Sequence, residues 1–423
     1  MKKYSFRIIY QFFVLSWFSF TGLFNGIFVF FVATSLKIAI DTVLTLGLII
    51  FNRNARKISL YQFLFIVFYM FITLSSLLLF FRYNHYGFEK LLKNVILTWL
   101  TLLDYFILYI NFRDTSFSKG IVRIFLVQIF VECFLFFLYI LYNKNSGLIS
   151  QSYIQGFIFQ DFVGRFQGSF SEPSFLGFWL GCVICVLSLI FRRKIKYVSA
   201  ALLIVILYWA CKAKFALLAF PGAIICAVCV PRRFFSKYNL EIFFSLICFC
   251  LLSLFWKNVS ESFFICLSHL IPRKASATYV TRFAFLLSSL QNICFYPIGH
   301  GFGLNYEVFQ NIFTDIAPIA KNVNLEIFEL LSYRLDPNNM GSKDTLSLII
   351  SSCGFLGIIL YLQYFKKLLC DKYRYPFASL ALILFIFFES IITGNIFSNS
   401  SFFIVLFAKM ALNSNKIEDK NNE

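Results

Sequence analysis

The chain has few charged residues and few of the side chains that soluble enzymes use for acid–base or metal chemistry. Only 14% of its 423 residues are charged, 20 are acidic and three are histidines. Hydrophobic residues make up 60% of the chain, and phenylalanine alone occurs 60 times. A water-soluble core of ordinary size cannot bury so much apolar surface. The composition therefore excludes a soluble globular protein and predicts a polytopic membrane protein.

Apolar stretches recur along the chain, as expected for helices that cross about 30 Å of hydrocarbon. We expect an all-α membrane bundle of twelve spans. The first apolar stretch is longer than a signal-peptide core, so we expect it to remain as an uncleaved span. The predicted spans lie near residues 9–32, 35–51, 60–81, 94–111, 120–142, 174–191, 197–211, 215–230, 239–257, 345–365, 376–393 and 396–412.

Positive charge is scattered in small clusters, although the net charge is +18. Nucleic-acid binding would need a continuous basic stripe or patch, so no nucleic-acid partner is expected. The clusters fall in alternate connections between the predicted spans, on the same side of the membrane as Lys2 and Lys3. Positive charge is enriched on the cytoplasmic side of membrane proteins, so we expect this side to be cytoplasmic and both termini to lie there. They are Arg53, Arg56 and Lys57; Arg113 and Lys119; Arg192, Arg193, Lys194 and Lys196; Arg232, Arg233 and Lys237; and Lys366, Lys367, Lys372 and Arg374.

Two connections on the opposite, outer side are long: a first outer loop at residues 143–173 and a large outer loop at 258–344. Long loops between spans are uncommon unless they have a function. In the large loop, residues 322–335 have apolar side chains at helical spacing and predict an amphipathic helix. Residues 281–297 are apolar but too short to span, so we expect them to dip into the outer leaflet. The polar tail, 413–423, is predicted to be disordered.

The twelve cysteines lie mostly inside predicted spans. Two C-x-x-C pairs, Cys182 with Cys185 and the pair at 226 and 229, have no histidine nearby, so we interpret them as small buried hydrophobic residues and predict no metal site. Cys266 and Cys294 lie in the large outer loop. They can form a disulfide if their compartment is oxidising, which leaves their pairing open.

The stretch VGRFQGSFSEPSFLG, residues 163–177, places Arg165 and Glu172 at the entry to the sixth span, among glycines that allow close backbone approach. A planar guanidinium is well suited to bind phosphate or diphosphate. A structural interpretation is also open, in which Glu172 or the preceding serine caps the helix, Pro173 occupies its first turn and Arg165 is an interfacial anchor.

A second stretch, TRFAFLLSSLQNICFYPIGHGFG at residues 281–303, supplies Arg282 and then a glycine-rich turn that carries His300. No strand precedes the glycines, so they do not indicate nucleotide binding. His300 is either a solvated residue in a turn, or a general base or phosphate ligand.

Three stretches, in this order and all near the outer face, resemble the Wzy-type superfamily of O-antigen polymerases and O-antigen ligases. Residues 164–177 are similar to an Arg-x-x-Gly-x-x-x-Glu-Pro entry to a span. Residues 282–303 resemble an arginine, an amphipathic helix and a Pro-x-Gly-x-Gly segment. SKDTLSLIISSCGFLGIILY, residues 342–361, resembles the segment that leaves the large loop and enters the next span. The resemblance covers residues 160 to 360, approximately.

The resemblance implies a GT-C-like bundle in the bacterial inner membrane that transfers glycosyl groups with inversion, without a metal or other cofactor. The donor would be a polyprenyl-diphosphate-linked glycan and the acceptor a sugar hydroxyl on a second lipid-linked unit. A chain-length-regulating copolymerase is a candidate partner, alongside the lipid bilayer. Surface polysaccharides of this kind include O-antigen, capsule and exopolysaccharide.

Site residues also follow from the resemblance. Arg165 and Arg282 would stabilise the diphosphate leaving group without a cation. The base that takes the proton of the acceptor hydroxyl would be one of three residues. These are Glu172, His300 and Asp344. Lys212 and Lys214 near the outer face either assist diphosphate binding or anchor the helix at the interface.

Ligases of the superfamily carry a histidine just before the span that follows the large loop, whereas this chain has Asp344 there. That difference favours polymerase, and ligase is the alternative within the same chemistry. A flippase or other transporter is the alternative from a different class, and it would favour charges within spans. The candidates for such charges are Asp41, Asp104, Glu132 and Glu389, for which we expect packing or topology roles, with Glu389 the one placed to face a catalytic cavity.

Overall fold

A computed structural model describes residues 6–19, 34–51, 58–81, 88–116, 118–144, 173–190, 214–229, 261–269, 273–304, 308–335, 344–392 and 399–417. Nearly all of these residues are helical, and no strand occurs among them. The only extended pairing in this part of the chain is an isolated bridge between Tyr373 and Lys416. The predicted all-α class is therefore confirmed for the described residues.

Helices occupy ten of the predicted spans. They are α1 (Phe6–Ser19), α3 (Thr34–Phe51), α4 (Leu60–Phe81), α5 (Phe88–Phe112), α6 (Lys119–Lys144), α8 (Pro173–Ile190), α10 (Lys214–Cys229), α17 (Thr345–Cys370), α18 (Pro376–Ile392) and α19 (Asn399–Asn415). Four described helices contain segments long and apolar enough to cross a membrane: Leu60–Phe80, Leu91–Phe112, Lys119–Ile140 and Thr345–Cys370. These helices make the chain a membrane protein. The predicted spans at 197–211 and 239–257, and residues 20–32 of the first, lie outside the described residues, so twelve spans stay a prediction.

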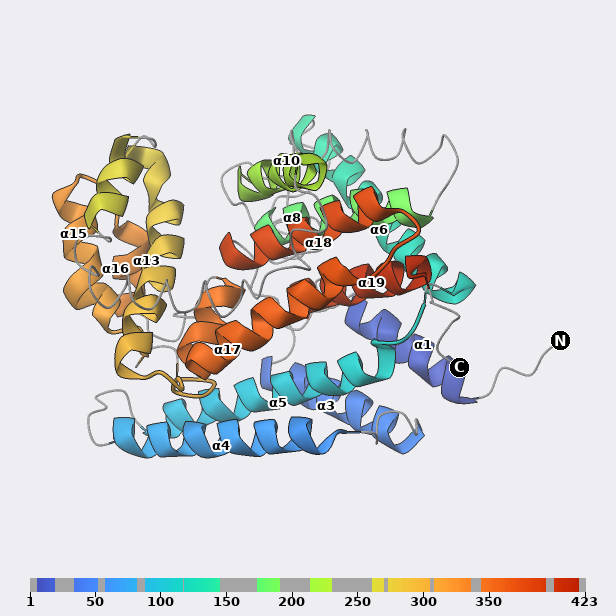
Figure 1. Cartoon of the computed structure of the whole chain (residues 1–423), viewed down its shortest axis with the longest axis horizontal. Helices are drawn as coiled ribbons and strands as arrows, with labels where there is room; N and C mark the ends of the chain where they lie inside the picture. Colours follow the sequence, from blue (N-terminus) through green and yellow to red (C-terminus); the bar gives the residue numbers. More distant parts are fainter. Residues whose placement is uncertain are drawn as a thin grey trace.

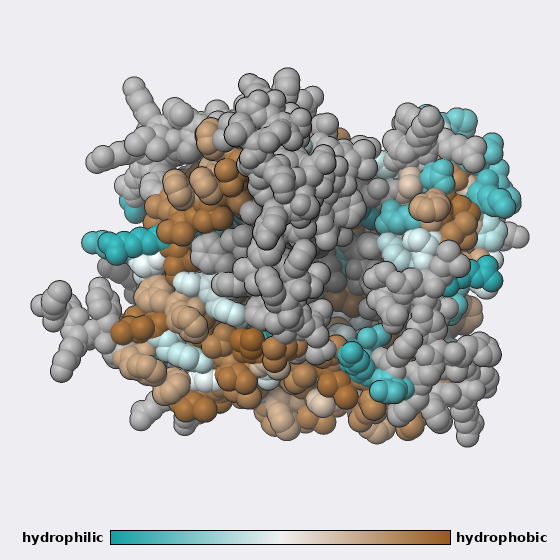
Figure 2. Space-filling model, turned by 180° about the vertical axis from the view of Figure 1, so that it is seen from behind, coloured by the Kyte–Doolittle hydropathy of each residue, from teal (hydrophilic) through white to brown (hydrophobic). Residues whose placement is uncertain are grey.

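The apolar helices lie side by side as a bundle (Figure 1), whose main core is formed by α8, α17, α18 and α19 together with parts of α1 and α5. Helix α4 lies at an edge and turns large apolar side chains outward, among them Phe63, Phe71 and Leu78. Figure 2 shows hydrophobic side chains gathered over this lower part of the molecule. Such an exposed apolar surface is unfavourable in water and suits contact with lipid.

The described residues of the predicted large outer loop fold as a second helical cluster at one end of the bundle (Figure 1), which we call the outer cluster. It contains a helix at 261–269, α13 (Arg273–Phe295), the π-helix η3 (Ile312–Ile316), α15 (Ala317–Asn322) and α16 (Phe328–Leu335). It has its own core, in which Phe285, Phe309 and Leu330 are fully buried. Helix α13 packs against α17 and thereby joins the outer cluster to the bundle.

Two local expectations were partly wrong. The helix expected over 322–335 begins only at Phe328, because the chain turns at Asn324, whose φ is 60°. Residues 281–297 belong mostly to the 23-residue helix α13, which packs into the core of the outer cluster, and their contact with the outer leaflet stays a prediction. The tail is ordered as far as residue 417, since α19 continues to Asn415 and Lys416 pairs with Tyr373, while residues 418–423 lie outside the described residues.

Helix α17 is broken at Gly354, where φ is 58° and ψ is −142°. The segment 297–303 fills the break. The N–H groups of His300 and Gly301 donate to the carbonyl oxygens of Ser351 and Ser352, each at 2.9 Å, and Phe355 N–H donates to Pro297 O at 2.9 Å. Irregular backbone at membrane depth is tolerated only where protein satisfies its polar groups, so the glycine-rich turn completes the hydrogen bonding of the broken helix.

Substituting Gly354 tests this docking. A Cβ at Gly354 would lie 2.1 Å from Pro297 O, and the positive φ disfavours any other residue, so we expect Gly354→Ala to lower the free energy of unfolding by about 1–3 kcal/mol or more. Gly222→Ala in α10 is the matched control, because no heavy atom lies within 4 Å of the added Cβ. It should be neutral or stabilising by about 0.5–1 kcal/mol. Unfolding of the detergent-solubilised variants measures both, and equal stabilities would contradict the docking account.

Candidate functional site

Three ionisable side chains lie near the junction of the outer cluster with the bundle. Arg282 lies on α13, Asp344 immediately precedes α17, and Glu389 lies near the end of α18. The charge of Arg282 acts on both carboxyl groups. Arg282 is half-buried, whereas Asp344 is 1% exposed and Glu389 is fully buried. We call these three residues the Arg282 cluster.

Asp344 caps the N-terminus of α17. Its Oδ1 accepts a hydrogen bond from Ser347 N–H and its Oδ2 accepts one from Ser347 Oγ, both at 2.6 Å. Burial raises the pKa of Asp344 to about 7, and the hydrogen bonds from Ser347 and the positive charge of Arg282 limit that rise. The carboxyl group therefore changes its protonation state near neutral pH while staying within range of a permanent positive charge.

Glu389 is fully buried in the bundle interior, near the C-terminal end of α18. The neighbouring residue Ser390 is hydrogen-bonded to the Tyr361 hydroxyl of α17, which fixes the two helices against each other next to Glu389. The expectation from sequence was that Glu389 is the span carboxylate placed to face a site. The structure places Glu389 within electrostatic range of Arg282, one of the three described candidates from the predicted large loop.

His300 is buried instead of solvated. Its ring lies 4.0 Å from the ring of Tyr296 and 5.6 Å from that of Phe80, measured between centroids. Burial lowers the pKa of His300 to about 4, so the imidazole is neutral at physiological pH. About 20 Å of helix separates Arg282 from the end of α13 at Phe295, where the segment carrying His300 begins. His300 therefore belongs to the turn docked on α17, and the structure does not bring it into the Arg282 cluster.

The other predicted site residues are not described. Arg165, Glu172 and Lys212 lie outside the described residues, together with most of the first outer loop, 143–173. Lys214 begins α10, but its side chain is not described. Of the predicted diphosphate-binding side chains, the described part of the chain therefore places Arg282.

No group of three or more His, Cys, Asp or Glu side chains with the spacing of a metal site occurs among the described residues. Cys182 and Cys185 are buried in α8, while Cys226 and Cys229 lie on α10, one of them exposed. Cys266 and Cys294 are both free thiols in this structure.

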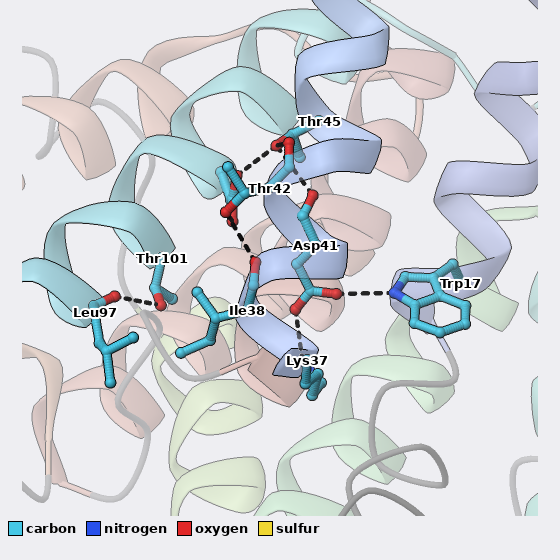
Figure 3. A network of polar contacts seen from close by, with 9 residues as sticks. Trp17, Lys37, Ile38, Asp41, Thr42, Thr45, Leu97 and Thr101 are labelled. Carbon is cyan, nitrogen blue, oxygen red and sulfur yellow. Dashed lines mark hydrogen bonds and ion pairs between the residues drawn. The ribbon is translucent and has the colours of Figure 1, made fainter. Parts of the chain in front are cut away.

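A second polar cluster, which the sequence did not reveal, lies inside the bundle between α1, α3 and α5 (Figure 3). Asp41 accepts from Lys37 Nζ at 2.6 Å and from Trp17 Nε1 at 2.8 Å, and Asp104 accepts from the hydroxyl groups of Thr42, at 3.1 Å, and Thr45. We call it the Asp41–Asp104 network.

The charged members of this network are almost completely buried: Lys37 is 2%, Asp41 4% and Asp104 2% exposed. We expected no partner for Asp41 from sequence. The sequence nevertheless contained a signal for this ion pair: Lys37 lies four residues before Asp41, and side chains at that spacing meet on one face of a helix. The fourth span carboxylate, Glu132, is buried on α6.

Comparison of the chain with family models, curated proteins and solved structures gives no match. The Arg282 cluster and the Asp41–Asp104 network are therefore the observations on which a functional assignment rests.

Proposed function

We propose that the protein is a surface-polysaccharide polymerase, a membrane glycosyltransferase that joins polyprenyl-diphosphate-linked repeat units at the outer face of the inner membrane. The observation that carries the proposal is that the charge of Arg282 acts on the buried carboxyl group of Asp344 where helix α13 of the outer cluster packs against α17. The proposed substrate needs a site at the boundary between the apolar bundle and water. Its lipid tail prefers hydrocarbon, its diphosphate prefers cationic side chains and its glycan prefers water.

In this reaction the bond between the anomeric carbon of the donor glycan and the diphosphate oxygen breaks. The acceptor hydroxyl oxygen forms the new bond to that carbon, its proton goes to a base, and polyprenyl diphosphate leaves. Negative charge develops on the leaving group. A half-buried guanidinium such as that of Arg282 stabilises this charge strongly, because the surroundings exclude much of the water.

Asp344 is the better base of the two described candidates. A general base is most effective when its pKa lies near the working pH, and the pKa of Asp344 is about 7 while that of His300 is about 4. Asp344 also lies within electrostatic range of Arg282. We assign His300 to the packing of the 297–303 turn, and Arg165 and Glu172 keep the roles that the family resemblance implies.

The raised pKa of Asp344 predicts a pH dependence. A base must be deprotonated to act, so the rate of chain growth by the purified protein should rise as the pH increases through about 7 and level off above it. The effect on stability has the opposite sign, because a carboxyl with a raised pKa favours the folded state at low pH and loses that contribution as the pH rises to about 7. A rate that is flat between pH 5.5 and 8.5 would contradict Asp344 as base.

The proposal is tested in a deletion strain by gel analysis of surface glycan. The strain is complemented with wild type, Arg282→Ala or Arg334→Ala, and the membrane level of each protein is checked. Arg334 is the matched control, because it lies on α16 of the same outer cluster and is exposed. We expect Arg282→Ala to leave single repeat units on the surface lipid, as the deletion does, while Arg334→Ala restores long chains.

Other outcomes separate the alternatives. Long chains that accumulate on the polyprenyl carrier would assign the protein as a ligase, the alternative within the same chemistry. Absence of any glycan at the outer face would indicate a flippase or transporter. One observation favours that second class: the Asp41–Asp104 network places three ionisable side chains within the bundle, and such residues often mark transport pathways.

A further inference from the structure

The end of the bundle remote from the outer cluster has a cationic site that the proposed function does not use. Lys409 is the only charged residue of α19, an otherwise apolar and neutral polar helix. It is half-buried, and it lines a small recess between α17, α18 and α19. The rest of the lining is apolar and includes Tyr364, Leu368, Ile386 and Val405.

Charged side chains at the C-terminal ends of α5, α17 and α19 lie within electrostatic range of Lys409. The charges of Lys367, Lys416, Asp371 and Asp114 all act on it. Lys367 lies in the last turn of α17, and Lys416 follows α19 directly. Asp371 is bridged to Lys416 at 2.9 Å.

Asp114 belongs to the connection between α5 and α6 and is bridged to Arg113 at 3.1 Å. In these two ion pairs Lys416 neutralises Asp371 and Arg113 neutralises Asp114. The positive charges of Lys409 and Lys367 are additional to both pairs. The backbone of the region is fixed, since Asn413 Nδ2 donates to Arg113 O at 2.6 Å and Arg374 N–H donates to Asn415 O at 2.7 Å.

We propose that this recess is a binding site for an anionic phospholipid. The headgroup phosphate would contact the ammonium groups of Lys409 and Lys367 at the mouth of the recess, and the acyl chains would lie against the apolar surface beside Tyr364 and Val405, because the recess itself has room for only about one water molecule. Charge complementarity selects an anionic headgroup, and the position at the end of apolar helices places the site at headgroup depth, where basic pockets between membrane helices bind such lipids. The inference is independent of the proposed function, because Lys367 lies in the last turn of α17, whereas Asp344 of the Arg282 cluster precedes the first residue of the same helix.

The test is a thermal-shift titration of the purified full-length protein in micelles containing phosphatidylglycerol, phosphatidylcholine or, with no added lipid, inorganic phosphate. We expect a saturable rise of the unfolding midpoint with phosphatidylglycerol alone. Since one lysine near an anionic surface contributes about 1 kcal/mol, Lys367→Ala should raise the apparent dissociation constant about fivefold. Lys409→Met should do the same or more.

Lys321→Ala is the matched control, because this exposed lysine lies on α15 in the outer cluster, and it should bind phosphatidylglycerol as the wild type does. Lys367 is exposed at the protein surface, so its variant keeps the test valid even if Lys409→Met does not fold. Three results would overturn the proposal: an equal shift with phosphatidylcholine, an equal shift with inorganic phosphate, or the same apparent dissociation constant in the wild type and Lys367→Ala.

Discussion

Asp344→Asn should leave the protein folded but reduce chain growth by about 10²–10⁴-fold, the range expected when a general base is lost. Asparagine caps a helix about as well as aspartate, so the hydrogen bond from Ser347 N–H to the capping side chain can persist. The amide, however, cannot accept a proton from an acceptor hydroxyl. The measurement is the initial rate of chain growth by the purified variant, together with its thermal unfolding midpoint.

Asp344→Ala is the companion variant that separates the two roles of this residue. It removes both the cap and the carboxyl group, so it should lose activity and also about 0.5–2 kcal/mol of stability. If Asp344→Asn retains full activity while Asp344→Ala is unstable, then Asp344 is only a capping residue, and the base must be sought in the first outer loop, where Glu172 lies.

Asp41→Ala should be the most destabilising substitution among the polar residues of the bundle. It would leave the Lys37 ammonium, which is 2% exposed, without the carboxylate 2.6 Å away, and it would also remove the acceptor of Trp17 Nε1. Breaking one partner of a buried ion pair costs about 3–5 kcal/mol. Denaturant-induced unfolding of the detergent-solubilised variant measures this loss.

Two further variants test the physical reason. Asp114→Ala breaks an ion pair whose aspartate side chain is 87% exposed, so its effect should stay below about 1 kcal/mol. The double variant Lys37→Met with Asp41→Leu removes both charges together, and it should recover much of the stability that Asp41→Ala loses. If the double variant is as unstable as the single one, the cost arises from packing and not from the orphaned charge.

The helices were predictable from sequence because hydrocarbon demands long apolar segments, and the described parts of the predicted spans begin and end within a few residues of observed helices. The break in α17 was not predicted. Residues 345–365 contain no charged residue, and a helix-breaking glycine in such a stretch cannot be distinguished from a helix-packing one without knowing that the 297–303 turn docks there. The same docking explains why His300 is buried, which its glycine-rich surroundings in the sequence did not indicate.

The candidate site was predictable residue by residue but not as an arrangement. Arg282, Asp344 and Glu389 were each singled out, yet their proximity depends on how α13 packs against α17 and on where α18 ends, which are long-range contacts. The Asp41–Asp104 network shows the reverse case. Its local half, Lys37 with Asp41, follows from a spacing of four residues, whereas the Thr42 and Thr45 contacts to Asp104 join α3 to α5 and cannot be derived from local pattern.

The most direct test of the central claim measures both products of the proposed reaction at once. Purified wild-type protein and Arg282→Ala are reconstituted in liposomes with polyprenyl-diphosphate-linked repeat units, and glycan length and free polyprenyl diphosphate are followed over time. The account predicts one polyprenyl diphosphate released for each new glycosidic bond, with both products lost in Arg282→Ala. Release of neither product by well-folded wild-type protein, or unchanged release by Arg282→Ala, would contradict it.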